Sequence, residues 1–209
     1  MIESKQTLSG KVYWAVTPPL TRLVGRAAWR LEIDSGEGFP DPPFVIASNH
    51  HSFLDAFLIS AAYREKVRFL ALDDLFGNYG WVDFSLTAYD VIPIKRGAVA
   101  LGPLRHALDH LSTGGVVGVF PEGTRHSGFD PARVRRGAAW LAVRAGVPLV
   151  PVAVVGSENV LGPDNKLHRG RIRVRVGPSL HPSGSGRREV GALMDRWTDW
   201  VSFALTQGG

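Results

Sequence analysis

A regular alternation of short apolar runs with segments of helical periodicity limits the fold more than any other feature of this chain. The apolar runs are FVIAS at 44–48, VRFLA at 67–71, VIPI at 91–94, VVGVF at 116–120 and LVPVAVVG at 149–156. Segments of helical pattern follow Ser52 and occupy 101–111 and 135–146. Strands that alternate with helices favour a parallel sheet with helices on both faces. The sequence therefore predicts an α/β fold with a largely parallel central sheet flanked by helices.

The C-terminal part adds one more strand and one more helix. RIRVRV at 171–176 alternates Arg with Ile and Val, which predicts a half-exposed edge strand with one basic face. The segment 187–205 has the pattern of an amphipathic helix. With 209 residues, of which 44% are hydrophobic, the chain can bury one full core. We expect a single α/β domain over residues 35–209, preceded by a separate segment over residues 1–34.

The N-terminal segment has two helical stripes of different character. Apolar residues recur at helical spacing at Leu20, Leu23, Val24, Ala27, Ala28 and Leu31, and arginines stand four apart at Arg22, Arg26 and Arg30. Trp14 and Trp29 lie close by, and Pro18 and Pro19 suit the first turn of a helix. Such a helix, beginning at the prolines, suits the headgroup region of an anionic membrane. The alternative is a surface helix packed on its own domain.

Charge and composition narrow the classes of partner and chemistry. Lys and Arg number 24 and Asp and Glu 19, so the net charge of +5 favours an anionic partner. There are no cysteines, which excludes thiolate nucleophiles, zinc–thiolate sites and disulfides. No apolar run approaches the roughly 18 residues of a membrane-spanning helix, and no secretory leader is evident. We therefore expect a cytosolic protein without a transmembrane span that can still contact a membrane surface.

The sequence NHHSFLD at 49–55 places two histidines and an aspartate where a strand gives way to a helix. Ser52 and Asp55 fit an S-x-x-D helix cap, with Ser52 at the N-cap. A helix cap does not explain His50. This residue lies in a loop at the carboxyl end of a strand, where open α/β sheets usually bind ligands. With His50 in the loop, its ring can fold back onto Asp55. A His held by a carboxylate is a general-base unit.

The nucleophile that this base would activate is less obvious. Ser52 is one candidate, but the G-x-S-x-G sequence of serine hydrolases is absent and a capping function already explains this serine. A substrate hydroxyl is the more economical choice. Two other strand ends bring polar groups to the same edge: FPEGTR at 120–125, where Gly permits close approach and Arg can bind phosphate, and VIPIKRG at 91–97, which delivers Lys95 and Arg96.

Four segments together resemble a known family. NHHSFLD, VIPIKRG, FPEGTR and VPLVPV are similar, in this order, to the four blocks of the glycerolipid acyltransferases, the family of the 1-acylglycerol-3-phosphate acyltransferases. NHHSFLD matches its H-x-x-x-x-D signature at His50 and Asp55, and the match extends from about Asn49 to Val152. Four ordered blocks are far more specific than one motif. Two departures are His51, where the family often has Gln, and His126, where it often has Ser.

The resemblance implies an α/β fold, peripheral membrane attachment and transfer of a fatty acyl group from a thioester of coenzyme A or acyl carrier protein, with no cofactor and no metal. It implies that His50 is the general base and Asp55 its orienting partner. Matching residues of the other blocks would bind the glycerol phosphate end of the acceptor: Arg96, Glu122, Gly123, Thr124 and Arg125. The expected acceptor is 1-acylglycerol-3-phosphate, a lysophospholipid, and the expected product is phosphatidic acid; glycerol phosphate or another lipid alcohol is the alternative. Residues 35–209 would then be the acyltransferase domain.

Two other classes of function remain as alternatives. A metal hydrolase would use His50, His51 and Asp55, although adjacent histidines project differently and no complete ligand set lies nearby. The pair His106 and His110, four residues apart, has a spacing that can bind zinc, although such a pair is more often structural. A basic nucleic-acid module would rest on RIRVRV and the net charge, but it explains none of the four blocks, so we expect no nucleic-acid partner.

Overall fold

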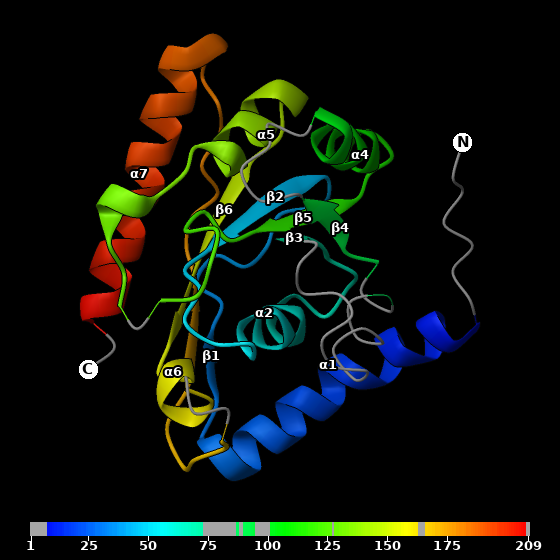
Figure 1. Ribbon diagram of the computed structural model, residues 1–209, viewed down its shortest axis with the longest axis vertical. Helices are drawn as coiled ribbons and strands as arrows, with labels where there is room; N and C mark the ends of the chain where they lie inside the picture. Colours follow the sequence, from blue (N-terminus) through cyan, green and yellow to red (C-terminus); the bar gives the residue numbers. More distant parts are fainter. Residues whose placement is uncertain are drawn as a thin grey trace.

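The computed structural model describes residues 8–72, 87, 90–94, 101–126, 128–162 and 166–207 (Figure 1). These residues contain one seven-stranded sheet in the order β1-β7-β6-β2-β5-β3-β4. The strands are β1 (Glu32–Asp34), β2 (Phe44–Ser48), β3 (Arg68–Leu72), β4 (Ile92–Ile94), β5 (Val116–Val119), β6 (Leu149–Val155) and β7 (Arg173–Val176). All neighbouring pairs are parallel except β6 and β7. The predicted α/β fold with a largely parallel sheet is confirmed.

Helices cover both faces of this sheet (Figure 1). They are α1 (Leu8–Trp29), α2 (Asp55–Tyr63), α4 (Leu101–Ser112), α5 (Gly137–Ala145), the short α6 (Ser157–Val160) and α7 (Gly186–Thr206). On β2, Val45 and Ala47 pack toward α4, α5 and α7, whereas Phe44 and Ile46 pack toward α1 and α2. Both faces of the strand are therefore apolar, which explains why the sequence of a central parallel strand is a continuous apolar run.

The carboxyl ends of three adjacent strands meet at one edge of the sheet. β2 lies between β6 and β5 and is parallel to both. The loops after Ser48, after Val119 and after Val155 therefore leave the sheet side by side. Chain connections diverge to the two sides of β2 at this point, which is where open α/β sheets usually bind ligands.

The last strand is not an edge strand, so that prediction was wrong. β1 pairs with β7 and occupies the edge itself, in a register that opposes Glu32 to Arg173 and Asp34 to Arg175. Arg173 Nη2 lies 3.0 Å from Glu32 Oε2, and Arg175 Nε lies 3.8 Å from Asp34 Oδ2. The basic face that indicated exposure is matched by acidic side chains of a three-residue strand.

Helix α1 begins at Leu8 and has Pro18 and Pro19 inside it, so the predicted start at the proline pair was wrong. Packing explains the earlier start, because Tyr13 and Trp14 contact the core cluster beneath α2. Outward, α1 presents an apolar stripe with exposed fractions of 40–68%: Val12, Val16, Leu20, Leu23 and Val24.

None of the helices described is both long enough and apolar enough to cross a membrane. The division of the chain at residue 34 stays a prediction.

Candidate active site

His50 and Asp55 meet at the carboxyl edge of the sheet. His50 lies in the loop after β2, and Asp55 is the first residue of α2. His50 Nδ1 is 3.0 Å from Asp55 Oδ2, and the two side chains are 18% and 0% exposed. Because an ionised carboxylate only accepts hydrogen bonds, Nδ1 donates in this contact, which leaves Nε2 with a free lone pair. Among the described residues, only Nδ1 of this ring has a hydrogen-bond partner.

The carboxylate of Asp55 accepts hydrogen bonds from the backbone of the preceding turn. Its Oδ2 accepts hydrogen bonds from the backbone N–H groups of His51 and Ser52, each at 2.8 Å. The predicted N-cap function of Ser52 was wrong: α2 begins at Asp55, and Leu54 is at the N-cap without a side-chain cap. Asp55 itself binds the free amides, while Ser52 Oγ accepts from Leu54 N–H at 3.2 Å and donates to the Leu161 carbonyl at 2.9 Å.

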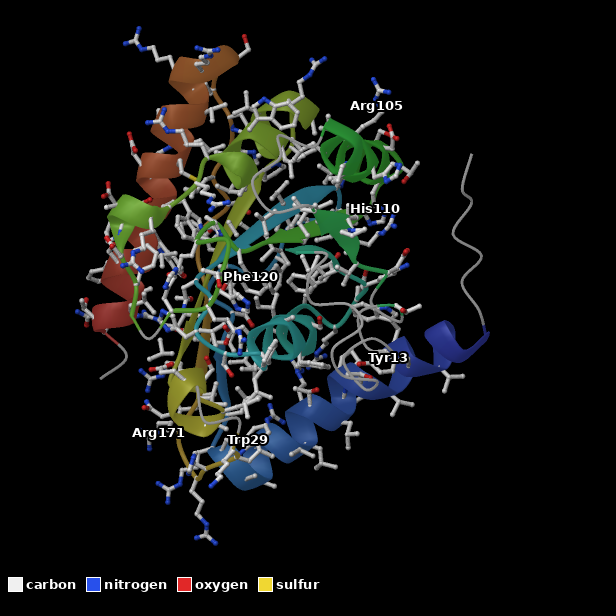
Figure 2. All side chains as sticks on the ribbon, viewed as in Figure 1. Tyr13, Trp29, Arg105, His110, Phe120 and Arg171 are labelled. Carbon is white, nitrogen blue, oxygen red and sulfur yellow. The ribbon has the colours of Figure 1, made fainter. Side chains whose placement is uncertain are left out.

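The imidazole ring of His50 is also held by stacking. Its centroid lies 3.9 Å from that of Phe120, at an interplanar angle of 16°. Phe120 in turn stacks on Phe69 at 5.6 Å, and Figure 2 labels Phe120 in the middle of the molecule. The ring plane of the histidine is therefore fixed by an aromatic neighbour from the FPEGTR loop.

Glu122 binds the backbone of the histidine loop, residues 49–55, which run from the end of β2 to the first residue of α2. Its carboxyl group is 3% exposed, and Oε1 accepts a hydrogen bond of 2.7 Å from His50 N–H. Burial raises the pKa of Glu122, although the His50 amide and the nearby His51 oppose this shift. Its other oxygen, Oε2, is buried without a partner among the described residues. Glu122 thus ties the FPEGTR loop to the general-base candidate and keeps one acceptor atom available.

The rest of the FPEGTR loop lies at the same edge of the sheet as His50 and Asp55. Gly123 has a φ of +73°, which favours glycine. Thr124 and Arg125 are exposed, and the Arg125 guanidinium lies 3.4 Å from the centroid of the Phe53 ring. His126 N–H donates to the His50 carbonyl at 3.1 Å. The structure therefore brings together all predicted site residues except Arg96, which lies outside the described residues.

A family comparison identifies the chain. The family model described as Acyltransferase matches residues 30–155, a range that includes the His50 and Asp55 pair and the FPEGTR loop. The chain belongs to the acyltransferase family.

Relatives of this acyltransferase carry consistent names. It is 32% identical over 192 residues to the 1-acyl-sn-glycerol-3-phosphate acyltransferase of Pseudomonas aeruginosa, which covers 90% of this chain and 73% of that one. It is 32% identical over 172 residues to the 1-acyl-sn-glycerol-3-phosphate acyltransferase alpha of Bos taurus, covering 80% of this chain and 60% of that one. The chloroplastic relative LPAT1 of Arabidopsis thaliana is 28% identical, and the chain spans 45% of its length.

A solved structure supports the fold. The crystal structure of the 1-acyl-sn-glycerophosphate acyltransferase PlsC from Thermotoga maritima aligns with a TM-score of 0.73 over 99% of this chain and 83% of that chain. At 22% identity, this similarity concerns the fold of the acyltransferase and not its substrate.

Sequence reasoning missed several residues that build this site. Asn49 binds the backbone of β6 through two hydrogen bonds of 2.8 Å, from Nδ2 to the Val154 carbonyl and from Val154 N–H to Oδ1. Ser157 Oγ donates to Asp55 Oδ1 at 2.6 Å. The sequence places Ser157 directly after the predicted strand that ends at Gly156, at the same edge as the other two loops, but nothing in it indicates a contact with Asp55.

His51 forms a second histidine–carboxylate contact beside the first. His51 Nδ1 lies 3.6 Å from Glu158 Oε2. Burial lowers the pKa of His51, but the carboxylates of Glu158, Glu122 and Asp55 outweigh it, so the pKa is raised. Burial likewise raises the pKa of Glu158, and the contact with His51 outweighs this effect and lowers it.

The two histidines of α4 are in different environments. Figure 2 shows His110 on α4, away from Phe120; its ring packs closely against Gly115, and burial, Arg68 and Lys66 lower its pKa to about 4. His106 is exposed. Within the described residues, no group of three or more His, Asp or Glu side chains could hold a metal ion. A site without metal stays a prediction.

Proposed function

We propose that this acyltransferase moves a fatty acyl group from a thioester of coenzyme A or acyl carrier protein to the free hydroxyl of 1-acylglycerol-3-phosphate, which gives phosphatidic acid. The observation that carries the proposal is the 3.0 Å contact between His50 Nδ1 and Asp55 Oδ2 at the carboxyl edge of the sheet. The names of relatives in bacteria, plants and mammals support the choice of acceptor.

The chemistry follows from the orientation of His50. Nε2 takes the proton of the acceptor hydroxyl as its oxygen attacks the thioester carbonyl carbon. The tetrahedral intermediate collapses with cleavage of the C–S bond, and the imidazolium returns the proton to the leaving thiolate. Asp55 keeps the proton on Nδ1 and stabilises the imidazolium between these two steps. General-base catalysis of this kind typically contributes about 10²- to 10⁴-fold in rate.

The acceptor headgroup would lie at the loop after β5. Arg125 and Arg96 supply positive charge for the phosphate, and Gly123 and Thr124 complete that side of the site. Glu122 is buried and its carboxylate would repel a phosphate, so it would serve this site by holding the His50 backbone through Oε1. Replacement of Arg96 by Ala is expected to raise the apparent KM for the acceptor.

The outward stripe of α1 supports peripheral attachment to an anionic membrane. Its five apolar side chains point away from the domain, and Arg26 in the last turn and Arg30 just after the helix are exposed. Such a helix can lie in the headgroup region with its apolar side inserted. An amphiphilic acceptor resides in the same layer, so attachment would shorten its path to His50. The cytoplasmic face is part of this proposal.

The test is a coupled assay of both products. Purified protein is incubated with a long-chain acyl-CoA or acyl carrier protein and 1-acylglycerol-3-phosphate, and thiol release and phosphatidate are measured together. We expect equimolar products, loss of at least about a hundredfold in kcat for His50→Ala, and no change for His106→Ala, which removes an exposed histidine on α4. Thiol release without phosphatidate would mean that the acyl group passes to water and would refute 1-acylglycerol-3-phosphate as the acceptor, and no thiol release from either donor would refute acyl transfer itself.

A further inference from the structure

We infer that Ser157 is a positioning residue for acyl transfer: its hydroxyl fixes the carboxylate of Asp55, which in turn orients the base His50. This inference rests on the proposed function. It concerns a residue that lies in none of the four sequence blocks and is 102 positions away from Asp55.

The Asp55 carboxylate accepts hydrogen bonds from four donors among the described residues. Three donors converge on Oδ2: the His50 ring and the backbone amides of His51 and Ser52. Ser157 Oγ donates to Oδ1 at 2.6 Å, and it is the only donor to that oxygen among the described residues. A short hydrogen bond to a carboxylate is charge-assisted and stronger than a neutral one. Since three donors share one oxygen, the Ser157 bond sets the rotation of the carboxylate plane.

Both partners of this hydrogen bond are shielded from solvent. Ser157 and Asp55 are both 0% exposed. Solvent therefore does not compete for Oδ1, and loss of the hydroxyl would leave a buried anionic oxygen without its donor. Such an oxygen is costly, and the carboxylate would turn to find another partner. A turn of the carboxylate would move Oδ2 relative to His50 Nδ1.

The segment that carries Ser157 is held in place on both sides of this residue. Gly156 precedes it with a φ of +84°, and a Cβ there would collide with the Arg171 carbonyl, so the turn out of β6 requires glycine. Asn49 binds Val154 on one side of Ser157, and Ser52 Oγ binds the Leu161 carbonyl on the other. The chain from Val154 to Leu161 is thus hydrogen-bonded to the histidine loop before, at and after Ser157.

The kinetic expectation follows from these contacts. Ser157 is fully buried beneath the dyad, so its effect should fall on kcat and not on acceptor binding. Ser157→Ala is expected to lower kcat about tenfold to a hundredfold, the effect of losing one charge-assisted hydrogen bond, with the acceptor KM within about twofold. Ser157→Thr keeps the hydroxyl and should recover most of kcat. Ser157→Cys, a weak donor of similar size, should remain impaired.

Ser60 offers a matched control. It is also a fully buried serine, it belongs to α2 like Asp55, and its hydroxyl donates to the Ala56 carbonyl at 2.8 Å. Ser60→Ala removes a hydroxyl of equal burial that does not contact the dyad, so kcat should stay within about twofold of wild type. Thermal denaturation of every variant shows whether it is folded at the assay temperature.

Two experiments decide the inference: a double-mutant cycle measured by kcat, and spectra of the His50 ring that need no activity. If Ser157 acts through Asp55, Ser157→Ala should cause no further loss of kcat in an Asp55→Asn background. Long-range ¹H–¹⁵N spectra of the His50 ring should show the Nδ1–H tautomer in wild type and Ser60→Ala, and a mixture of tautomers in Ser157→Ala.

Unchanged kcat and unchanged ring spectra in a folded Ser157→Ala variant would overturn the inference, as would equal losses in both backgrounds. If wild type makes no phosphatidate, the proposed function fails, and the ring spectra still decide whether Ser157 orients the dyad.

Discussion

The guanidinium carbon of Arg125 lies 3.4 Å from the centroid of the Phe53 ring, so an aromatic residue of the histidine loop supports a cation of the FPEGTR loop. A cation–π contact contributes about 0.5 to 2 kcal/mol. Phe53→Leu should therefore raise the acceptor KM about threefold to tenfold by releasing Arg125, with kcat nearly unchanged. Steady-state kinetics with varied 1-acylglycerol-3-phosphate measure this change. Phe53→Tyr keeps the ring and should behave as wild type, and an unchanged KM in Phe53→Leu would place the phosphate elsewhere.

Substitution of Glu122 tests how far its hydrogen bond with His50 N–H stabilises the histidine loop. Glu122→Ala leaves the buried His50 amide without its acceptor, so we expect a loss of about 1 to 3 kcal/mol in the free energy of unfolding together with reduced kcat. Glu122→Gln retains a carbonyl oxygen for this amide and should lose less stability. Urea denaturation of the three proteins measures the difference. Equal stabilities of wild type and Glu122→Ala would show that the amide does not depend on this acceptor.

Membrane attachment through α1 can be separated from catalysis. The double variant Leu20→Ser with Leu23→Ser removes two side chains that are 51% and 68% exposed on the outward stripe. Each inserted leucine contributes about 1.5 kcal/mol or more, so liposome affinity should fall at least tenfold. Co-sedimentation with anionic vesicles measures affinity, and turnover of a water-soluble short-chain acceptor should be unchanged. Phe203→Ser, which removes a 60% exposed side chain on α7, is the control, and equal binding of all three proteins would contradict membrane contact through α1.

The pair of His51 and Glu158 predicts a pH-dependent stability. The pKa of His51 is raised above its usual 6.5, so protonated His51 stabilises the fold below pH 6.5 and this contribution is lost as pH rises through the raised value. The pKa of Glu158 is lowered below its usual 4.5, so its contribution is present above pH 4.5 and lost as pH falls through the lowered value. The pair therefore stabilises most between pH 4.5 and 6.5.

Thermal melts across pH check this expectation. The difference in Tm between wild type and His51→Gln should be larger within that window than at alkaline pH, where His51 is neutral. Glu158→Gln should reduce the same difference. A Tm difference that does not vary with pH would mean that His51 is neutral throughout.

The central strands and the dyad could be predicted because their signals are local. Runs such as FVIAS are buried on both faces, and the five-residue spacing of His50 and Asp55 spans one strand-to-helix turn. Contacts between distant segments leave no such signal. Arg173 looked solvent-exposed until Glu32 of a three-residue strand paired with it, and the helical pattern before Pro18 depends on the packing of Tyr13 and Trp14. The bond from Ser157 to Asp55 depends on the adjacency of β2 and β6, which only the assembled sheet reveals.

Helix α2 connects the catalytic dyad to helix α1. Asp55 is its first residue, and at its other end the carbonyls of Ala61 and Ala62 accept hydrogen bonds from Arg22 of α1. Nine helical residues span about 13 Å at a rise of about 1.5 Å each. The length of α2 therefore fixes the spacing between its contact with α1, the helix with the outward apolar stripe, and the dyad of Asp55 and His50. Insertion of one helical turn into α2 would therefore shift Asp55 and His50 by about 5.4 Å relative to the helix that carries the apolar stripe.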